Sequence, residues 1–269
     1  MTDLLIVILL GIVEGVTEFL PVSSTGHLIL AGRLLGLPGA DATFDIVIQL
    51  GAILAVVVLF WQRFMAVLAG LQRREPAAIA FTRNVLLGFL PSAIVGALAY
   101  KAIKVVLEAP TVGPVVVAVA LIVGGVVILF VERVKPPAEP SSVEGMSWRI
   151  ALGVGVVQCI SMIPGVSRSG ATIMGARAMG VDRGTATEYS FFLAIPTMLG
   201  ATTLALWKGR HELGDAHLTS IAIGFAVSFV VALAVIRWFV GIVGRHGFAP
   251  FAWYRIAAGT VALVALAVR

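Results

Sequence analysis

Two carboxylates, a run of hydroxyls, a glycine and a histidine stand close together in the segment EGVTEFLPVSSTGH, residues 14–27. Glu14 and Glu18 are four residues apart, a spacing that directs both carboxylates to the same face of a helix. Two like charges so close repel one another unless they are protonated, paired with a cation or bridged by a metal ion. Hard divalent cations take carboxylate oxygens, and Mg²⁺ commonly shares one or two carboxylates with a substrate phosphate. The pair therefore indicates a site for a divalent cation, Mg²⁺ or Ca²⁺.

The residues after Pro21 are suited to binding anionic oxygens. Proline ends the first helix, and the donors that follow stand at the N-terminus of a second helix, which favours negative charge. These donors are Ser23, Ser24, Thr25 and Gly26. His27 follows Ser24 by three residues, within reach as a general base or as a nucleophile itself. We predict a nucleophile and a base in this segment, and the sequence leaves open whether Ser24 or His27 attacks.

A second polar segment, PGVSRSGAT at residues 164–172, supplies a cation that the first segment lacks. An arginine in an apolar environment needs an anionic partner, and the planar fork of Arg168 suits two oxygens of a phosphate at once. The neighbouring side chains that could add hydrogen bonds to a phosphate are Ser167, Ser169 and Thr172. Carboxylates, hydroxyls, an arginine and a histidine are the groups that phosphoryl transfer uses. The two segments together predict a site for a phosphate head group on a lipid-soluble tail.

The same residues also have structural interpretations. Glu14 and Glu18 could be bonded to backbone amides or paired with Arg168, and the hydroxyls could satisfy broken helix ends. Gln49, in the middle of an apolar segment, fits either a hydrogen bond between helices or a place in the site. Residues expected outside the site are Asp45 and Glu188, as charges at helix N-termini, and His211, His217 and His246, in loops.

Composition decides the class of protein that must position these groups. The chain has 269 residues, of which 59% are hydrophobic and 12% charged, and its mean hydropathy is +1.05. Soluble domains are typically about 45–50% apolar and about 25% charged, so this is an integral membrane protein. The net charge of +5 comes from scattered basic residues and indicates charged loops, with no soluble domain to bind nucleic acid. The single cysteine, Cys159, excludes an intramolecular disulfide.

Six segments are apolar enough to cross a bilayer, which takes about 20 such residues. They are about 43–61, 84–101, 112–132, 189–207, 218–240 and 250–268, with tryptophans near several ends. Residues 3–36 and 147–180 differ, because each contains a short apolar run, a polar break and a second short run. Such a pattern is typical of a re-entrant hairpin. The predicted fold is an all-α polytopic membrane protein with six transmembrane helices and two re-entrant helical hairpins.

The two hairpin segments are similar in sequence. A shift of 144 residues places Glu14 on Gln158 and residues 22–26 on residues 166–170. Three crossings follow each hairpin, so the second half enters the membrane inverted, and the two broken helices meet near its midplane. We therefore predict one domain, residues 1–269, composed of a first repeat at about 1–132, a linker at about 133–146 and a second repeat at about 147–269.

Lysine and arginine residues divide unequally between the two faces of this topology. Six fall on the face of the termini: Arg33, Lys101, Lys104, Lys208, Arg210 and Arg269. Ten fall on the other face: Arg63, Arg73, Arg74, Arg83, Arg133, Lys135, Arg149, Arg177, Arg183 and Arg245. Because cytoplasmic loops carry the excess of these residues, the second face is predicted to be cytoplasmic and both termini to lie outside.

The segments EGVTEFLPVSSTGH and PGVSRSGAT resemble the two signature regions of the bacterial undecaprenyl-pyrophosphate phosphatases, the bacitracin-resistance family. The resemblance extends along the chain and includes FDIVIQLGAILAVVVLFW at residues 44–61. It implies hydrolysis of the C55 isoprenoid pyrophosphate to the monophosphate carrier lipid and inorganic phosphate, with a divalent cation. It also implies a place in the bacterial plasma membrane, an active site open to the outer face and a part in recycling cell-wall precursors.

Position by position, the resemblance implies a role for each matching residue. Glu14 and Glu18 would act on the metal ion and the pyrophosphate, and Ser24 and His27 would supply the nucleophile and the base. Arg168 would bind phosphate. The expected partners are the polyprenyl pyrophosphate and membrane lipids, without nucleic acid, and a homodimer is compatible with the sequence.

Two other classes of function fit part of the pattern. Inverted repeats with broken helices are also transporter architecture, so a transporter or polyprenyl-phosphate flippase is an alternative that would need no nucleophile and base. The tetrapeptide STGH at 24–27 and the pair SR at 167–168 also resemble motifs of membrane phosphatases with a vanadium-haloperoxidase-like site. That mechanism needs an upstream Lys…Arg-Pro element and a second histidine after the Ser-Arg pair, and the sequence has neither.

Overall fold

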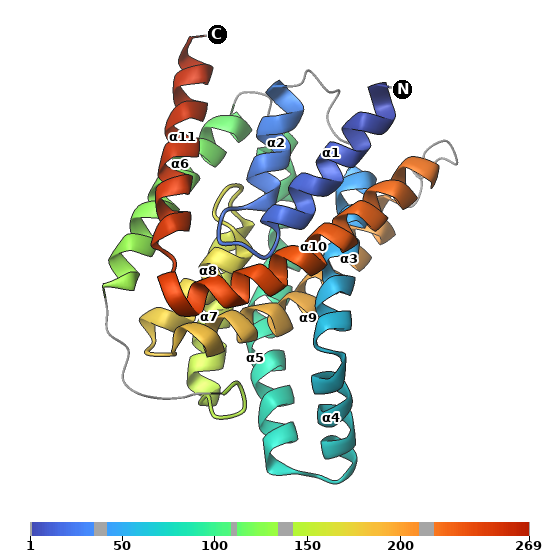
Figure 1. The fold of residues 1–269 in the computed structure, drawn as a ribbon, viewed down its shortest axis with the longest axis vertical. Coiled ribbons are helices and arrows are strands. Elements are labelled where there is room, and N and C mark those ends of the chain that lie inside the picture. Colours follow the sequence, from blue (N-terminus) through green and yellow to red (C-terminus); the bar gives the residue numbers. More distant parts are fainter. Residues whose placement is uncertain (1, 35–41, 109–111, 134–141, 210–217, 269) are drawn as a thin grey trace.

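The computed structural model describes residues 2–34, 42–108, 112–133, 142–209 and 218–268, and within these ranges every regular element is a helix. The helices are α1 (Thr2–Thr17), α2 (Ser24–Leu34), α3 (Ala42–Leu59), α4 (Trp61–Gln72), α5 (Pro76–Glu108), α6 (Val112–Glu132), α7 (Trp148–Gln158), the short 3₁₀ helix η1 (Cys159–Met162), α8 (Arg168–Ala178), α9 (Arg183–Gly209), α10 (Leu218–His246) and α11 (Ala249–Ala267) (Figure 1). The predictions for His211, His217 and the centre of the linker, residues 134–141, lie outside the described residues.

Several helices are long and apolar enough to cross a membrane. In the described residues they are Pro76–Ala99, Gly113–Glu132, Thr219–His246 and Ala249–Ala267, and a fifth span is formed if α3 and α4, bent by 69° at their junction, count as one. The prediction of an all-α protein that crosses the membrane several times is therefore confirmed. These spans overlap five of the six predicted crossings, while the sixth, residues 189–207, falls within α9, which is not among the candidates by length and composition.

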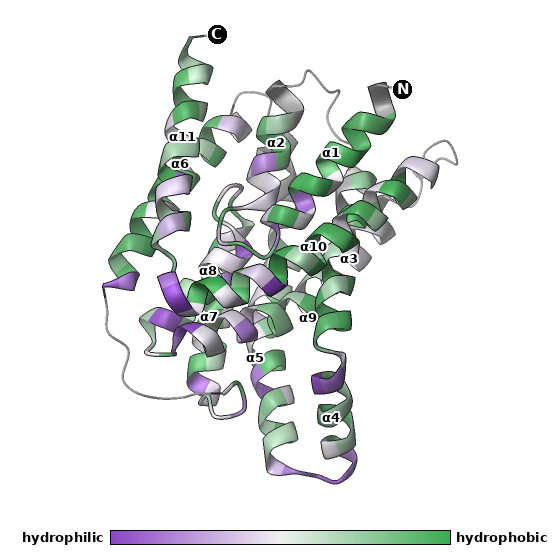
Figure 2. Cartoon of the chain, in the orientation of Figure 1, coloured by the Kyte–Doolittle hydropathy of each residue, from purple (hydrophilic) through white to green (hydrophobic). Residues whose placement is uncertain are grey.

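The outer surface of the helix bundle is apolar, as lipid contact requires. Leu98 is 82% exposed, Phe130 71% and Val261 68%. Figure 2 shows hydrophobic residues along the outer faces of α6, α10 and α11, whereas hydrophilic residues concentrate near the breaks and at the helix ends. Large apolar side chains exposed in such number belong in hydrocarbon rather than in water.

The two predicted hairpins are present as pairs of short helices. Their first legs, Leu4–Thr17 and Trp148–Met162, are apolar but shorter than a span. In Figure 1, α1 and α2 enter from the end of the molecule that carries the N-terminus of α1 and the C-terminus of α11. Helices α7 and α8 enter from the opposite end. This arrangement suits an inverted repeat, whose boundaries remain a prediction.

Glycines let α10 pack closely on α1 and α3. A Cβ atom at Gly15 would lie 2.7 Å from the carbonyl oxygen of Ser228, and one at Gly51 would lie 2.4 Å from that of Phe225. Small residues allow helix backbones to approach in a membrane, where packing rather than the hydrophobic effect holds helices together. Helix α1, which leads into the first break, and helix α3, which carries Gln49, therefore both pack on α10.

Ion pairs join the loops at the end of the molecule opposite to the termini. The Glu132 carboxylate, at the end of α6, accepts hydrogen bonds from Arg183 at 2.8 and 3.2 Å and from the backbone amide of Phe248 at 3.1 Å. Arg63 and Glu144 form a second pair, with 2.5 Å between Nη2 and Oε2. Both arginines belong to the face that is predicted to be cytoplasmic, and the orientation itself remains a prediction.

Candidate active site

Ser23 and Ser167 give the two breaks the same local structure. Both residues have a left-handed backbone, with φ of 73° and 77°, a conformation that is uncommon outside glycine. Each side chain also caps the helix that follows, since Ser23 Oγ accepts from the amide of Gly26 at 3.3 Å and Ser167 Oγ from that of Gly170 at 3.0 Å. The 144-residue shift aligns both pairs, so sequence similarity and backbone geometry agree.

The two breaks touch one another inside the bundle. Ser169 Oγ, from the second break, donates to the carbonyl oxygen of Leu20 in the first at 2.7 Å. A Cβ atom on Gly26 would lie 3.4 Å from the Cα atom of Gly165, so the backbones of the two breaks lie side by side. Side chains from residues 18–27 and 161–168 can therefore meet in one site.

Arg255, in the middle of α11, binds the backbone of both breaks. Its side chain is almost fully buried, at 1% exposure. A guanidinium has five N–H donors, and here they reach five carbonyl oxygens at 2.9–3.3 Å. The acceptors are Pro21 in the first break, Gly165 and Val166 in the second, and Ala120 and Leu121 in α6. We did not predict this residue, although a lone arginine inside the apolar segment 250–268 was a signal for it.

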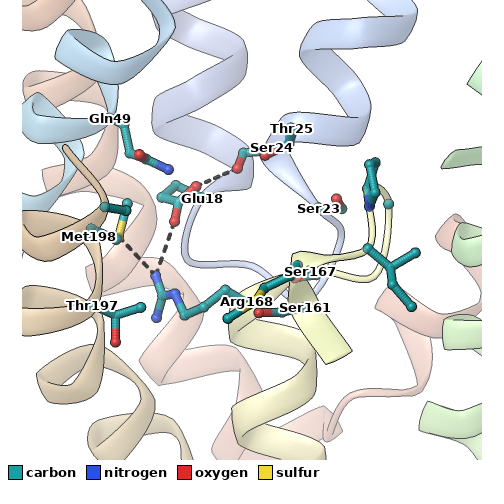
Figure 3. Close-up of a pocket in the computed structure, with 15 residues that line it drawn as sticks. Glu18, Ser23, Ser24, Thr25, Gln49, Ser161, Ser167, Arg168, Thr197 and Met198 are labelled. Carbon is teal, nitrogen blue, oxygen red and sulfur yellow. Dashed lines mark hydrogen bonds and ion pairs between the residues drawn. The ribbon is translucent and has the colours of Figure 1, made fainter. Parts of the chain in front are cut away.

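Glu18, Ser24 and Arg168 form a hydrogen-bonded group where the breaks meet. Ser24 Oγ donates a short hydrogen bond to Glu18 Oε2, and Arg168 Nη2 lies 3.1 Å from Glu18 Oε1 (Figure 3). The other guanidinium nitrogen, Nη1, donates to the carbonyl oxygen of Ser190 at 2.9 Å. The carboxylate therefore holds a hydroxyl and a cation on its two oxygens, which orients both.

This group opens into a cavity of about 210 Å³. Its polar lining residues are Glu18, Ser23, Ser24, Thr25, Gln49, Ser161, Ser167, Arg168 and Thr197. Met162, Ile163, Pro164, Met198 and Ala201 supply an apolar part of the wall. A small set of polar groups on an otherwise apolar lining is typical of a site that binds and orients a small ligand.

His27 lies apart from this group. Its Nδ1 atom is 2.7 Å from the carbonyl oxygen of Ser23, and its Nε2 atom is 2.7 Å from the hydroxyl of Tyr254, whose ring stacks on the imidazole. His27 is not among the residues that line the cavity. The Ser24 hydroxyl is therefore hydrogen-bonded to Glu18 and not to His27, although the spacing in sequence suggested the histidine as its base.

Four other predicted site residues also lie outside the cavity lining. Ser169 and Thr172 are fully buried, and Thr172 Oγ1 bonds to the carbonyl oxygen of Arg168 at 3.0 Å and to Ser190 Oγ at 2.7 Å. Gly26 packs against the second break, and Glu14, one helical turn before Glu18, is buried at 1% exposure. Glu14 is close enough to Arg168 for a favourable charge interaction. These residues surround the groups that line the cavity.

A divalent cation fits this site only together with a ligand. Among the residues described, no group of three or more acidic, histidine or cysteine side chains could hold a metal ion alone. Glu14 and Glu18 nevertheless offer hard oxygen donors, and Mg²⁺ is often bound by one or two carboxylates, waters and substrate phosphates. The donor set suits that shared arrangement.

The position of Gln158 makes the two hairpins chemically unequal. It is aligned with Glu14 and is likewise fully buried, but its amide nitrogen donates to Ser92 Oγ at 2.6 Å and to Thr197 Oγ1 at 3.3 Å. A carboxylate in the first hairpin thus corresponds to an amide in the second. The first hairpin supplies the carboxylate and hydroxyl of the site, and the second supplies the arginine.

Comparison with known proteins identifies the family of the chain. A family model described as "Bacitracin resistance protein BacA" matches residues 7–261. The chain belongs to the BacA family. It is 71% identical over 267 residues to the undecaprenyl-diphosphatase of Rhizorhabdus wittichii and 60% identical over 268 residues to that of Sphingopyxis alaskensis, covering 99% of each chain in both cases. A more distant relative, from Acidovorax ebreus, is 51% identical over 258 residues, with 95% of this chain and 92% of its own covered.

Membership of the BacA family confirms the resemblance that the two signature segments carry. The three relatives share one name, that of a phosphatase, and none of them is named as a transporter. Each match also covers more than nine-tenths of both chains, so it includes the two hairpins and the helices that support them.

Proposed function

We propose that this BacA-family chain is an undecaprenyl-diphosphate phosphatase. It hydrolyses undecaprenyl pyrophosphate to undecaprenyl phosphate and inorganic phosphate, and so regenerates the carrier lipid for cell-wall synthesis. The observation that carries the proposal is the group Ser24–Glu18–Arg168, where a hydroxyl is bonded to a carboxylate beside a guanidinium. A site that only binds a lipid phosphate has no need of a hydroxyl oriented by a carboxylate.

In the first step Ser24 is the nucleophile. Its Oγ atom attacks the terminal phosphorus, a bond between Oγ and phosphorus forms, and the bond from phosphorus to the bridging oxygen breaks. The Ser24 proton passes to Glu18, which already accepts its hydrogen bond. Undecaprenyl phosphate leaves with the bridging oxygen. Arg168 donates to the non-bridging oxygens and stabilises the negative charge that they carry in the transition state.

The second step releases inorganic phosphate. A water molecule attacks the phosphorus, and the bond from phosphorus to Ser24 Oγ breaks. The protonated Glu18 returns its proton to the serine oxygen, takes one from the attacking water and finally releases it to solvent. A divalent cation held by Glu14 and Glu18 together with the substrate would neutralise charge on the phosphate oxygens. Ser169, Thr172 and Gly26 would act by holding the breaks in place rather than by touching substrate.

The surroundings of the cavity suit a lipid substrate. The breaks lie inside a bundle with an apolar outer surface, so a pyrophosphate can enter the polar cavity while the isoprenoid chain stays in hydrocarbon. The positive-inside count of loop residues supports an orientation in which the termini, and the first hairpin, lie on the outer side of the bacterial inner membrane. We infer that the site receives its substrate from that face.

Phosphate release by the purified protein tests the proposal. In detergent, the wild type should convert undecaprenyl pyrophosphate to the monophosphate and one equivalent of inorganic phosphate. Substrate labelled at its terminal phosphorus and quenched during turnover should leave the label on Ser24, and Ser24→Ala should form neither labelled protein nor product. Label on His27, or turnover by Ser24→Ala at the wild-type rate, would exclude Ser24 as the nucleophile. Thr203→Val, at an exposed hydroxyl of α9 that bonds to the carbonyl oxygen of Leu199, is the control and should keep wild-type activity.

A further inference from the structure

Gln49 faces the active-site cavity from a helix that belongs to neither break. It lies in the middle of α3, and its side chain lines the cavity and is directed toward Glu18 and Ser24 (Figure 3). We propose that Gln49 is a substrate-binding residue whose carboxamide donates a hydrogen bond to the terminal phosphoryl group of the pyrophosphate.

Gln49 differs in its hydrogen bonding from Ser161 and Thr197, two other polar residues of the cavity wall. Ser161 Oγ donates to the carbonyl oxygen of Gln158 at 2.6 Å, and Thr197 Oγ1 donates to that of Leu193 at 2.8 Å. Over the residues that the structure describes, the Gln49 carboxamide has no such partner. A carboxamide inside so apolar a helix is costly unless it is hydrogen-bonded. Its partner is therefore expected in the cavity, from water in the free protein and from the ligand in the complex.

Close packing of one face of α3 fixes the direction of this side chain. Ile48 and Ala52 are fully buried, and Gly51 brings α3 so close to α10 that a Cβ atom there would contact the carbonyl oxygen of Phe225 at 2.4 Å. Successive residues are rotated by about 100° around an α-helix. With residues 48, 51 and 52 held against the bundle, α3 cannot turn to carry Gln49 away from the cavity. A group fixed in this way loses little freedom when it binds a ligand.

The chemistry of a carboxamide suits the terminal phosphoryl group. Because Ser24 must approach the terminal phosphorus, a side chain directed toward Ser24 also lies beside the non-bridging oxygens on that phosphorus. Glutamine donates hydrogen bonds without adding charge, so it can bind phosphate next to Glu18 without disturbing the ion pair with Arg168. This inference rests on the proposed phosphatase function and adds to it a binding residue outside the two signature segments.

Kinetic measurements on Gln49→Leu test the assignment. The substitution removes the carboxamide and keeps much of the side-chain volume. We expect kcat/KM for undecaprenyl pyrophosphate to fall about 10- to 100-fold, the effect of losing one hydrogen bond to a charged group, with an unchanged unfolding midpoint. Gln49→Glu, which puts a second negative charge beside the phosphate, should fall further. Thr260→Val, at an exposed hydroxyl of α11 that bonds to the carbonyl oxygen of Ile256 and lies outside the cavity lining, is the control and should keep wild-type activity.

A binding measurement separates this inference from the proposed function. In the Ser24→Ala background, which cannot form a phosphoserine, Gln49→Leu should weaken the binding of undecaprenyl pyrophosphate about tenfold or more. Unchanged binding, or a lowered unfolding midpoint with normal kinetics, would overturn the assignment and leave Gln49 as a residue of helix packing. If Gln49→Leu does not fold, Gln49→Met and Gln49→Glu carry the same test. A wild type that binds the pyrophosphate through Gln49 but releases no phosphate would refute the proposed function alone.

Discussion

Arg168 and Glu18 are 150 residues apart in the chain and form an ion pair of 3.1 Å inside the bundle. The pair joins the second break to the first and leaves both side chains on the cavity wall. The other guanidinium nitrogen, Nη1, is bonded to the carbonyl oxygen of Ser190 at 2.9 Å. Arg168 thus has a fixed position before substrate arrives, which is the condition for effective stabilisation of transition-state charge.

Arg168→Lys tests whether the geometry of the guanidinium matters as well as its charge. Lysine keeps the charge but cannot bond Glu18, Ser190 and a phosphate with one planar fork. Losing a preorganised donor to a charged transition state typically costs about 100- to 1000-fold in rate. We expect kcat/KM to fall at least about 100-fold while the protein still inserts and folds, and Arg168→Ala to fall further. Near-normal turnover by Arg168→Lys would reduce the arginine to a structural counter-ion.

Glu18→Gln tests the carboxylate as the acceptor of the Ser24 proton. The amide can still accept a hydrogen bond, but it cannot take up a proton, so the serine loses its base. General bases contribute about 100- to 10,000-fold, and we expect a loss of that order in kcat. Glu144→Gln, which breaks the partly exposed pair with Arg63, is the control and should change activity little. If Glu18→Gln turned over at the rate of the control, another group would have to be the base.

Removal of divalent cations tests the metal proposal. We expect chelation to abolish phosphate release by the wild type and added Mg²⁺ or Ca²⁺ to restore it, since the carboxylates are proposed to bind the cation together with the pyrophosphate. Glu14→Gln should raise the cation concentration that gives half-maximal activity. An unchanged requirement in Glu14→Gln would remove Glu14 from the metal site, and full activity of the chelated enzyme would remove the metal from the reaction.

The left-handed backbone conformation that Ser167 has in common with Ser23 predicts different thermal stabilities for Ser167→Ala and Ser167→Gly. Alanine and glycine at position 167 both remove the Oγ cap, but alanine keeps an unfavourable left-handed conformation, whereas glycine adopts that conformation readily and so offsets the lost cap. Loss of a cap costs about 1 kcal/mol, and a protein of this size loses roughly 2–4 °C in Tm for each kcal/mol. Ser167→Ala should therefore unfold a few degrees lower and Ser167→Gly close to the wild type, as measured by thermal unfolding in detergent. Equal midpoints for the two variants would contradict the left-handed assignment.

Apolar runs and polar breaks were sufficient to predict an all-α protein that crosses the membrane several times and the meeting of the two breaks. The break residues Glu18, Ser24 and Arg168 could be grouped from sequence because polar side chains deep in a membrane protein must find one another. The residue that accepts the hydrogen bond of the Ser24 hydroxyl could not be predicted in this way. Ser24 begins a helix, so its hydroxyl can turn to the preceding segment, where Glu18 is, as easily as to His27 in the next turn. Periodicity within one helix does not decide between the two.

Arg255 was missed for a different reason. All of its acceptors are backbone carbonyl groups. Because every residue has one, the sequence does not indicate which of them accept a hydrogen bond. A lone arginine in an apolar span signals that a partner exists, but it does not say where that partner lies. Only the three-dimensional arrangement shows that the partners come from both breaks and from α6.

Arg255→Lys tests whether this residue holds the two breaks in register. Lysine offers three donors in place of five, so at least two buried carbonyl oxygens would lose their partner, at about 1–3 kcal/mol each. We expect a lower Tm and, because Gly165 lines the cavity and Pro21 is close to the lining residues Ser23 and Ser24, a lower kcat at nearly unchanged KM. Arg237→Lys, on the exposed surface of α10, is the matched control and should leave both quantities unchanged. A disulfide between the two breaks, in a background without Cys159, tests whether the activity lost in Arg255→Lys can be restored. The cysteines replace Leu20 and Ser169, since Ser169 Oγ is hydrogen-bonded to the carbonyl oxygen of Leu20 across the breaks. The disulfide should restore part of the lost kcat in Arg255→Lys. If the cross-linked variant regained Tm but no activity, Arg255 would serve stability alone.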